Sequence, residues 1–365
     1  MAEDVRVAGG GLSGLATALL LARAGRAVEV WDRRVGGGGR FHDGWQVIEN
    51  GTGEQDALAE LAALGFSGFE AIPATGAVFL DGLGGRHEVA SERPYAYFIR
   101  RGGGPGSIDA ALREQALAAG VTLHEGHSAP ERVDLVASGP RQADGVAREL
   151  VFASDLPDTI AVLFDPLVTP TGYAYLFCLG GHATFGVAQV RRVAGLRESA
   201  REAWRRFRAE LGEFAVRDER EGGQFMNFFL PRGLRDAAGR WHAGEAAGVQ
   251  DFLYGLGNRL ALRSAGLAAD GVLGRFDPER LRRTVLRPMR QTVALRFAYE
   301  RLGRRGFARF CRAAAEGGDF REFLIRVQRP RAIGLAAAAV AMAAWRARRG
   351  CRHGELCSWC RRSER

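Results

Sequence analysis

The sequence predicts a doubly wound α/β domain that is interrupted by an antiparallel sheet and followed by a helical C-terminus. The first observation is a glycine-rich turn at residues 9–14, between a predicted strand and a predicted helix. The second is residues 151–185, where β-branched and aromatic residues broken by Pro and Gly favour strands. The third is an arginine-rich segment from residue 279, where interleaved apolar residues indicate amphipathic helices. A chain of 365 residues is long enough to form these units around a sizeable core.

The N-terminal turn has the pattern of a dinucleotide fingerprint. A predicted strand at 4–8 runs into the sequence GGGLSG, which matches G-x-G-x-x-G and opens a helix. Gly9 permits the tight turn, Gly11 lets the backbone approach a pyrophosphate, and Gly14 allows the helix to pack closely on the strand. The next predicted strand ends at Asp32, whose carboxylate can accept hydrogen bonds from a ribose. An acid here disfavours a 2′-phosphate, so the pattern predicts a Rossmann-like domain that binds FAD or NAD rather than NADP.

A second glycine motif favours FAD. Residues 244–248 read GEAAG, and GLGN at 255–258 precedes a predicted helix over 259–269. Here the sequence resembles the flavoprotein superfamily of the aromatic hydroxylases and, more closely, the geranylgeranyl reductases, whose late motif is G-D-A-A-G followed by G-x-G. The resemblance implies that Glu245, in place of the family's Asp, holds a ribityl hydroxyl. It also implies that the G-x-G backbone lies against the flavin pyrimidine edge.

A third segment matches the same superfamily. Arg101 is followed by a glycine-rich turn and then by Asp109 and Leu112, which resembles the family's Arg…Asp-x-x-Leu…Ala segment. In the family an Arg at this place contacts the flavin. Arg101 is the first choice for that role here, and Arg100 is the alternative. Without such a role, either residue would be an ordinary exposed arginine. The residues expected to contact FAD are Gly9, Gly11, Ser13, Gly14, Asp32, Arg40, Arg101, Gly244, Glu245, Gly255, Gly257 and Asn258.

The middle of the chain carries the candidate substrate residues. GYAYLF at 172–177 alternates with period two, and 182–188 is a plausible partner strand. The stretch resembles the Tyr-x-Trp-x-Phe-Pro sequence that lines the lipid pocket of geranylgeranyl reductases, with Tyr175 for the Trp. Tyr173 and Tyr175 share one face, so they either border a pocket over the flavin or pack into the core. Candidate proton donors are Tyr173, Tyr175, His182 and Glu49, and no motif assigns the role.

These features lead to three functional hypotheses. The first is an FAD-dependent oxidoreductase that reduces double bonds of a hydrophobic, prenyl- or isoprenoid-like small molecule. The second is an FAD-dependent monooxygenase that hydroxylates a small aromatic or cyclic substrate, and the third is a flavin-binding scaffold without catalysis. Because no second fingerprint of matching context follows, the reductant is either NAD(P)H bound transiently or an electron-donor protein such as ferredoxin. All 51 basic residues are arginine, which excludes lysine-based catalysis.

The net charge of +9 divides unevenly along the chain. Residues 279–365 hold 22 Arg and 7 acids, so the preceding body is acidic. An alanine-rich run at 332–345 is flanked by arginines, and it either docks on an anionic membrane surface or packs as a helix on the body. A nucleic-acid partner is disfavoured because no binding motif is present. With no signal-peptide pattern and no apolar run of about eighteen residues, we expect a cytoplasmic protein, with peripheral membrane attachment as an open alternative.

Three of the five cysteines lie within the last fifteen residues. Cys351, His353, Cys357 and Cys360 supply the ligands of a Cys3His zinc site. The C-x-x-C pair formed by Cys357 and Cys360 is alternatively a redox pair, and an inert tail is the third interpretation.

The expected domain organisation interleaves the two main units along the chain. The predicted segments are an FAD-binding domain in three parts (1–70, 99–150 and 235–276), substrate-domain strands at 71–98, an antiparallel substrate domain at 151–234, an arginine-rich helical region at 277–350 and a Cys/His tail at 351–365.

Overall fold

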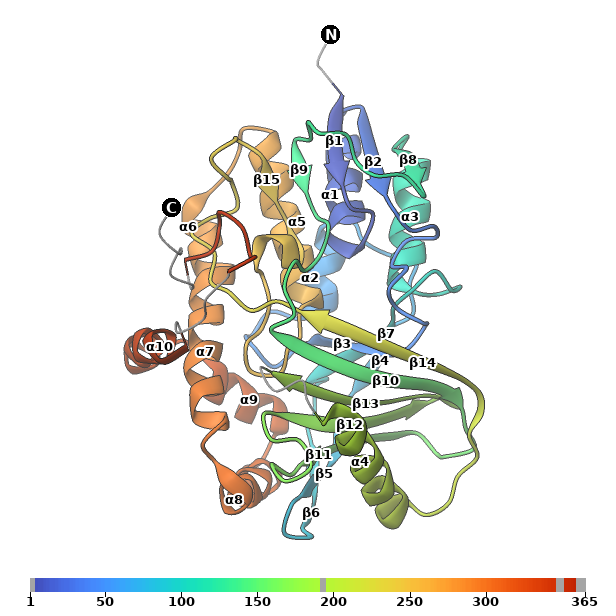
Figure 1. The fold of residues 1–365 in the computed structure, drawn as a ribbon, viewed down its shortest axis with the longest axis vertical. Helices are drawn as coiled ribbons and strands as arrows, with labels where there is room; N and C mark the ends of the chain where they lie inside the picture. The colour runs from blue at the N-terminus through green and yellow to red at the C-terminus, as the bar shows by residue number, and fades with distance from the viewer. Residues whose placement is uncertain (1–3, 191–194, 346–350, 359–365) are drawn as a thin grey trace.

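The computed structural model describes residues 4–190, 195–345 and 351–358. Within these ranges the strands form a parallel sheet, a larger mainly antiparallel sheet and a small sheet between them. Figure 1 shows the parallel sheet at one end of the molecule, the large sheet at the other, and the C-terminal helices along one side. The predicted fold class is confirmed.

The parallel sheet is the nucleotide-binding half of the fold. Its strands are β1 (Val5–Ala8), β2 (Val28–Asp32), β8 (Thr122–Glu125), β9 (Leu135–Val136) and β15 (Trp241–His242). Their order, β15-β9-β1-β2-β8, is the 3-2-1-4-5 order of Rossmann domains. The helices of this half are α1 (Leu12–Arg23), α3 (Ile108–Ala118) and α5 (Asn258–Val272), and α1 contacts both of the others. Because the strand order reverses at β1, ligands are expected at its carboxyl end.

The large sheet forms the opposite half. Its strands are β5 (Gly76–Asp81), β6 (Arg86–Ala90), β10 (Gly145–Ala153), β11 (Thr159–Phe164), β12 (Gly172–Leu179), β13 (His182–Val190) and β14 (Arg217–Met226). Their order is β14-β10-β13-β12-β11-β5-β6, antiparallel except for the β5–β11 pair. Helix α4 (Leu196–Leu211) covers one face with Ala203 and Phe207, which are fully buried. The sheet resumes at Gly145, earlier than the expected start at residue 151.

A small sheet fixes the two halves relative to each other. It contains β3 (Trp45–Glu49), β7 (Ala96–Arg100) and β4 (Ile72–Ala74), and α2 (Ala57–Ala63) follows β3. The Trp45 amide donates to Thr184 Oγ1 in the large sheet at 2.7 Å. Asn258 Nδ2, at the start of α5, donates to the Val47 carbonyl at 2.9 Å. One strand therefore holds both halves at the place where they face each other.

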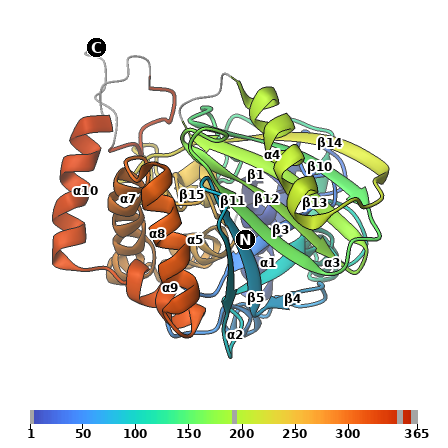
Figure 2. The same ribbon diagram turned by 90° about the horizontal axis from the view of Figure 1, so that it is seen from below.

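The arginine-rich segment is helical, as predicted. Its elements are α6 (Pro278–Leu281), a π-helical turn η2 (Arg282–Leu286), α7 (Arg287–Tyr299), α8 (Gly303–Glu316), α9 (Phe320–Gln328) and α10 (Ala332–Trp345). Figure 2 shows these helices gathered beside the sheets. Two of the arginines are buried: Arg296 Nη1 donates to the Leu253 carbonyl at 3.0 Å, and Arg321 Nε to the Asn50 carbonyl at 2.9 Å. Part of the positive charge therefore fastens the helices to the body.

Helix α10 packs against α7 through small residues. Ala338 and Ala341 are fully buried in a cluster with Met289 and Val293 of α7. On its other side Ile333 is 79% exposed. No helix in the described part of the chain is both long and apolar enough to span a bilayer. Docking of this region on a membrane surface stays a prediction.

Candidate functional site

A cavity of about 880 Å³ lies between the parallel sheet and the large sheet. Its volume falls within the range of small-molecule sites, roughly 300–1,000 Å³. Most of the residues predicted from sequence line it: Gly9, Gly11, Ser13, Asp32, Arg40, Arg101, Gly244, Glu245, Gly255, Gly257 and Asn258, together with Tyr173 and Tyr175. The structure thus brings the two glycine motifs and the aromatic strand to one space.

Glycine suits positions 9, 11 and 14 of the fingerprint for different structural reasons. Gly9 has φ of +110°, and a Cβ at Gly14 would lie 1.8 Å from the Gly9 carbonyl oxygen. Both are therefore required for the turn and for the close packing of α1, and Gly14 does not line the cavity. At Gly11 a Cβ would meet no atom of the described chain within 4 Å. Gly11 borders open cavity at the N-cap of α1, where the partial positive charge of a helix terminus favours a phosphate.

Asp32 closes the same turn from β2. Its Oδ2 accepts from the Gly10 amide at 2.7 Å, and its Oδ1 accepts from the Arg34 amide at 2.8 Å. The carboxylate is thereby oriented at the lining of the cavity. Its bonding to a ribose stays a prediction.

The early and late motifs touch at Ser13 and Gly244. Gly244 opens a 3₁₀ turn, η1 (Gly244–Ala247), with φ of +61°, and a Cβ there would lie 2.5 Å from Ser13 Oγ. Its amide donates to Ser264 Oγ of α5 at 2.8 Å. Only glycine lets this turn approach the start of α1, so segments some 230 residues apart build one wall.

Glu245 offers an acceptor to the cavity. Its Oε2 forms an ion pair with Arg40 Nη2 at 2.7 Å, and the Glu245 side chain is only 11% exposed. Its Oε1 is buried, with no hydrogen-bond partner among the described residues. A buried carboxylate oxygen without a partner is costly, and a ligand hydroxyl would satisfy it.

Arg101, rather than Arg100, lies in the cavity. The buried Arg101 guanidinium pairs with both carboxylate oxygens of Asp109, at 2.6 and 3.0 Å, and Nη1 donates to Asn258 Oδ1 at 2.6 Å. It thus connects α3 to the first residue of α5. Arg100 instead pairs with Asp43 at 3.1 Å, and it does not line the cavity.

The two tyrosines form an aromatic wall on β12. The Tyr173 hydroxyl donates to the Tyr254 carbonyl at 2.7 Å, and the Tyr175 hydroxyl donates to Glu149 Oε1 at 2.5 Å. Burial raises the pKa of both phenols. The neighbouring strand β13 requires a glycine beside Tyr175, because a Cβ at Gly186 would lie 2.2 Å from the Tyr175 ring.

Sequence reasoning missed the polar group behind Tyr175. Glu149 Oε1 also accepts from Gln46 Nε2 at 2.7 Å, and Oε2 accepts from Gln224 Nε2 at 2.8 Å. All three side chains line the cavity. The available signal was an acid on the face of β10 that otherwise carries Ala147 and Val151. The domain boundary expected at residue 150 places Glu149 in the nucleotide-binding domain, whereas β10 belongs to the large sheet.

Two of the proton-donor candidates lie elsewhere, so the structure does not support that role for them. His182 Nε2 lies 2.8 Å from the Asp43 carbonyl oxygen, and its ring contacts Trp45 edge-on. Burial raises the pKa of the Glu49 carboxyl to about 7, against an opposing effect of Arg259, but Glu49 is enclosed beside α5. Neither residue lines the cavity, because Glu49 is the last residue of β3 and His182 is the first of β13, each beyond the part of its strand that borders the cavity.

Comparison with known proteins agrees with this arrangement. A family model described as an NAD(P)-binding Rossmann-like domain matches residues 7–76, and no curated protein sequence matches the chain. A geranylgeranyl bacteriochlorophyll reductase-like protein from Thermoplasma acidophilum superimposes with a TM-score of 0.68 at 15% identity, over 92% of this chain and 95% of that one. The p-nitrophenol 4-monooxygenase PnpA from Pseudomonas putida DLL-E4 gives 0.64 at 16% identity, over 90% and 98%. The flavin-dependent halogenase CmlS gives 0.59 at 19% identity, over 94% and 78%.

The chain shares the fold of these solved structures, one of which is a flavin-dependent halogenase. The resemblance to geranylgeranyl reductases and aromatic hydroxylases is therefore confirmed at the level of the fold. The residues present also fit the cofactor that this flavoprotein fold implies: open space at Gly11, an acceptor without a partner at Glu245, and the N-termini of α1 and α5 at one cavity.

Proposed function

We propose that the protein is an FAD-dependent oxidoreductase that reduces double bonds of a hydrophobic, prenyl- or isoprenoid-like substrate. The observation that carries the proposal is a single cavity that joins the dinucleotide fingerprint to the aromatic wall. One end of the cavity has the open N-terminus of α1, which favours a phosphate. The other end has aromatic rings beside the hydrogen-bonded pair of Tyr175 and Glu149. Such a cavity is suited to a dinucleotide cofactor and a small molecule together.

The residues that would hold FAD come from three segments. The backbone at Gly11 and the N-terminus of α1 would receive the pyrophosphate, and Glu245 Oε1 would accept a ribityl hydroxyl. The N-terminus of α5 at Asn258 would favour negative charge next to it. Arg101 holds Asn258 in place through Oδ1. When bound, FAD would supply the electron transfer that the protein side chains lack.

The other end of the cavity would bind the substrate. The rings of Tyr173, Tyr175 and Phe177 exclude water and suit an apolar chain or ring. Reduction of a double bond requires a proton at carbon as well as electrons. The Tyr175 hydroxyl holds a proton at this wall, which it donates to Glu149 in this structure and would turn toward a bound substrate for the reaction. We therefore assign Tyr175 as the proton donor and Glu149 as its positioning residue.

Hydroxylation of a small aromatic substrate is the second candidate. It is favoured by the amides of Gln46 and Gln224, which offer hydrogen bonds to a polar ring substituent next to Glu149. In either case the reductant is NAD(P)H bound transiently at the cavity or an electron-donor protein.

A flavin-loading and turnover experiment tests the proposal. The full chain is purified, supplied with FAD and reduced without oxygen, and prenyl alkenes are added. We expect products with two added hydrogen atoms, detected by mass spectrometry, with flavin reoxidation that depends on the alkene. Oxygen uptake and a product with one added oxygen atom on a phenol would support the second candidate. A chain that takes up no FAD would overturn both, and bound FAD without turnover would indicate a scaffold.

A further inference from the structure

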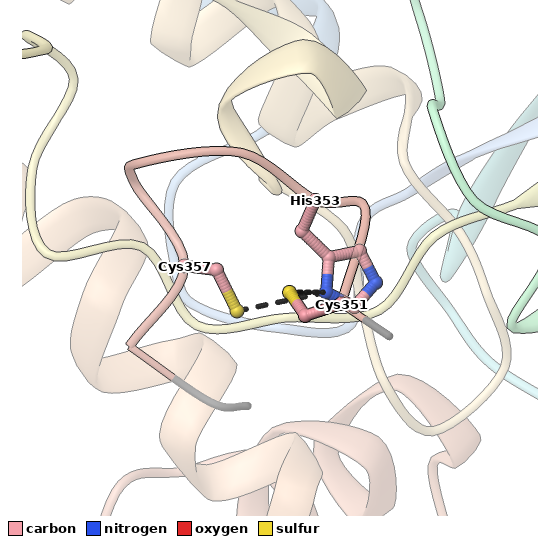
Figure 3. A group of neighbouring side chains, drawn as sticks. All are labelled: Cys351, His353 and Cys357. Atoms are coloured by element: carbon pink, nitrogen blue, oxygen red, sulfur yellow. Dashed lines mark hydrogen bonds between the residues drawn. The ribbon is translucent and has the colours of Figure 1, made fainter. Parts of the chain in front are cut away.

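The C-terminal segment places three metal-ligating side chains around one point, and none of the three lines the cavity. Cys351, His353 and Cys357 each offer a ligand atom, and these atoms lie within 4.8 Å of one another. Figure 3 shows both sulfur atoms directed at the same side of the imidazole ring. His353 is 3% exposed and Cys357 is 4% exposed, so two of the three side chains are sheltered from solvent, and Cys351 is half-buried.

The two nitrogen–sulfur separations within the cluster match tetrahedral coordination. His353 Nδ1 lies 3.4 Å from Cys351 Sγ and 3.5 Å from Cys357 Sγ. With a zinc–nitrogen bond of about 2.0 Å and a zinc–sulfur bond of about 2.3 Å, a tetrahedral angle puts nitrogen and sulfur about 3.5 Å apart. His353 Nδ1 can make only one strong hydrogen bond, although two sulfur atoms lie close to it. A metal ion between them would bond Nδ1 and both sulfur atoms at once.

The imidazole is held in the orientation that a metal ligand needs. Its Nε2 lies 2.5 Å from Asp144 Oδ2, and the ring stacks on Phe229 with centroids 4.8 Å apart. When Nε2 donates to the carboxylate, the neutral ring presents the lone pair of Nδ1 to the two sulfur atoms. A carboxylate behind a histidine is the usual support of a metal ligand. Asp144 is itself fixed, because its Oδ1 accepts from Gln142 Nε2 at 2.8 Å and its Oδ2 from the Phe228 amide at 2.8 Å.

We propose that Cys351, His353 and Cys357 bind a zinc ion that orders the C-terminal segment, which is fastened to the body through the contact of His353 with Asp144. The sequence offers a fourth thiol in C-x-x-C spacing, Cys360, which lies outside the described residues. The fastened segment runs beside residues 228–232: the Arg232 amide donates to the Leu356 carbonyl, and the Ser358 amide to the Leu230 carbonyl, both at 2.9 Å. Residues 228–232 follow the end of β14, where Phe225 and Met226 line the cavity. The role of the zinc ion is structural, and Asp144 acts as a positioning residue.

Metal analysis of the full chain tests the proposal. The protein is purified under reducing conditions without a metal-affinity tag, and zinc is measured by inductively coupled plasma mass spectrometry. We expect about one zinc ion per chain, and at least a tenfold loss in Cys351→Ser and Cys357→Ser. Cys311→Ala is the matched control, because Cys311 is buried in α8 in a different cluster and should leave the zinc content unchanged. Asp144→Asn should weaken zinc binding roughly 10- to 100-fold in competition with a chromophoric chelator.

Cobalt binding keeps the test independent of variant folding. The wild-type chain is stripped of metal and titrated with Co²⁺, and thiolate-to-cobalt charge-transfer absorption is expected. Wild-type protein that holds no zinc when purified and shows no such absorption would overturn the proposal. Retention of zinc by both cysteine variants would overturn it as well. A disulfide at Cys357 in unreduced protein, together with no metal binding after reduction, would assign the segment to thiol redox chemistry instead.

Discussion

Replacing Gly11 with alanine should separate cofactor binding from folding. The residue lies at the N-cap of α1 with φ of −84° and ψ of −172°, which alanine adopts without strain. Its Cβ would meet no atom of the described chain within 4 Å. The added methyl group therefore enters only the space that we assign to the FAD pyrophosphate. The substitution should weaken FAD binding and leave the fold intact.

The structure sets the size of both effects. Alanine reduces the entropy of the unfolded chain, which stabilises by about 0.4–1 kcal/mol, and it is a poorer N-cap than glycine. These effects offset each other, so the free energy of unfolding should stay within about 1 kcal/mol of wild type. Displacing a phosphate from backbone amides loses a charge-assisted hydrogen bond of about 1.5–3 kcal/mol, which is roughly a 10- to 150-fold rise in Kd.

Isothermal titration of the apo chain with FAD measures the binding effect, and urea unfolding without FAD measures the stability effect. Gly53→Ala is the matched control, because a Cβ at Gly53 also meets no atom within 4 Å but this residue does not line the cavity. If Gly11→Ala binds FAD as tightly as wild type, the end of the cavity at α1 does not take the pyrophosphate. If instead the apo variant is destabilised by several kcal/mol, the Cβ at residue 11 must clash with the protein, and our description of open space there is wrong.

Three further predictions follow from contacts in the cavity and core. Gly14→Ala should cost about 3 kcal/mol or more in urea unfolding, because its methyl group would lie 1.8 Å from the Gly9 carbonyl oxygen; wild-type stability would contradict the packing. Tyr175→Phe should lower kcat roughly 100-fold or more while FAD titration is unchanged, because it removes only the hydroxyl that donates to Glu149; an unchanged kcat would exclude the donor role. Burial raises the pKa of Glu49 from its ordinary value of 4.5 to about 7, so the folded state binds the carboxyl proton more tightly than the unfolded state does. The free energy of unfolding of the wild type should therefore fall as the pH rises from about 4.5 to about 7. Glu49→Gln should flatten that fall by up to about 3 kcal/mol when unfolding is compared at about pH 5 and about pH 8, and an identical profile would refute the shift.

The parts of the site that depend on local backbone geometry were predictable from sequence. Gly14 must be glycine because of the Gly9 carbonyl oxygen five residues away, and Gly9 has a positive φ that favours glycine, so the pattern is readable without a structure. The same holds for the strand that carries Tyr173 and Tyr175 on one face, since alternation follows from the strand itself. The grouping of Cys351, His353 and Cys357 was also readable, because the three residues lie at short spacing.

The parts that depend on long-range contacts were not predictable. Arg100 and Arg101 are adjacent and chemically identical, and only the positions of Asp109 and Asn258 decide which one faces the cavity. Glu149 becomes part of the site because Tyr175 reaches it from another strand. His182 and Glu49 carry suitable chemistry, but each lies at the end of its strand, outside the cavity.

The sequence by itself determined the fold class, the kind of cofactor to expect and the glycine pattern of the fingerprint turn, because these follow from backbone requirements within short segments. The tertiary structure decided how the segments meet. It joined the fingerprint, the late glycine motif and the aromatic strand in one cavity, and it buried part of the basic C-terminal charge against backbone carbonyls. It also brought Asp144 behind His353, more than two hundred residues away in sequence. Such pairings depend on the packing of whole elements, which no local pattern records.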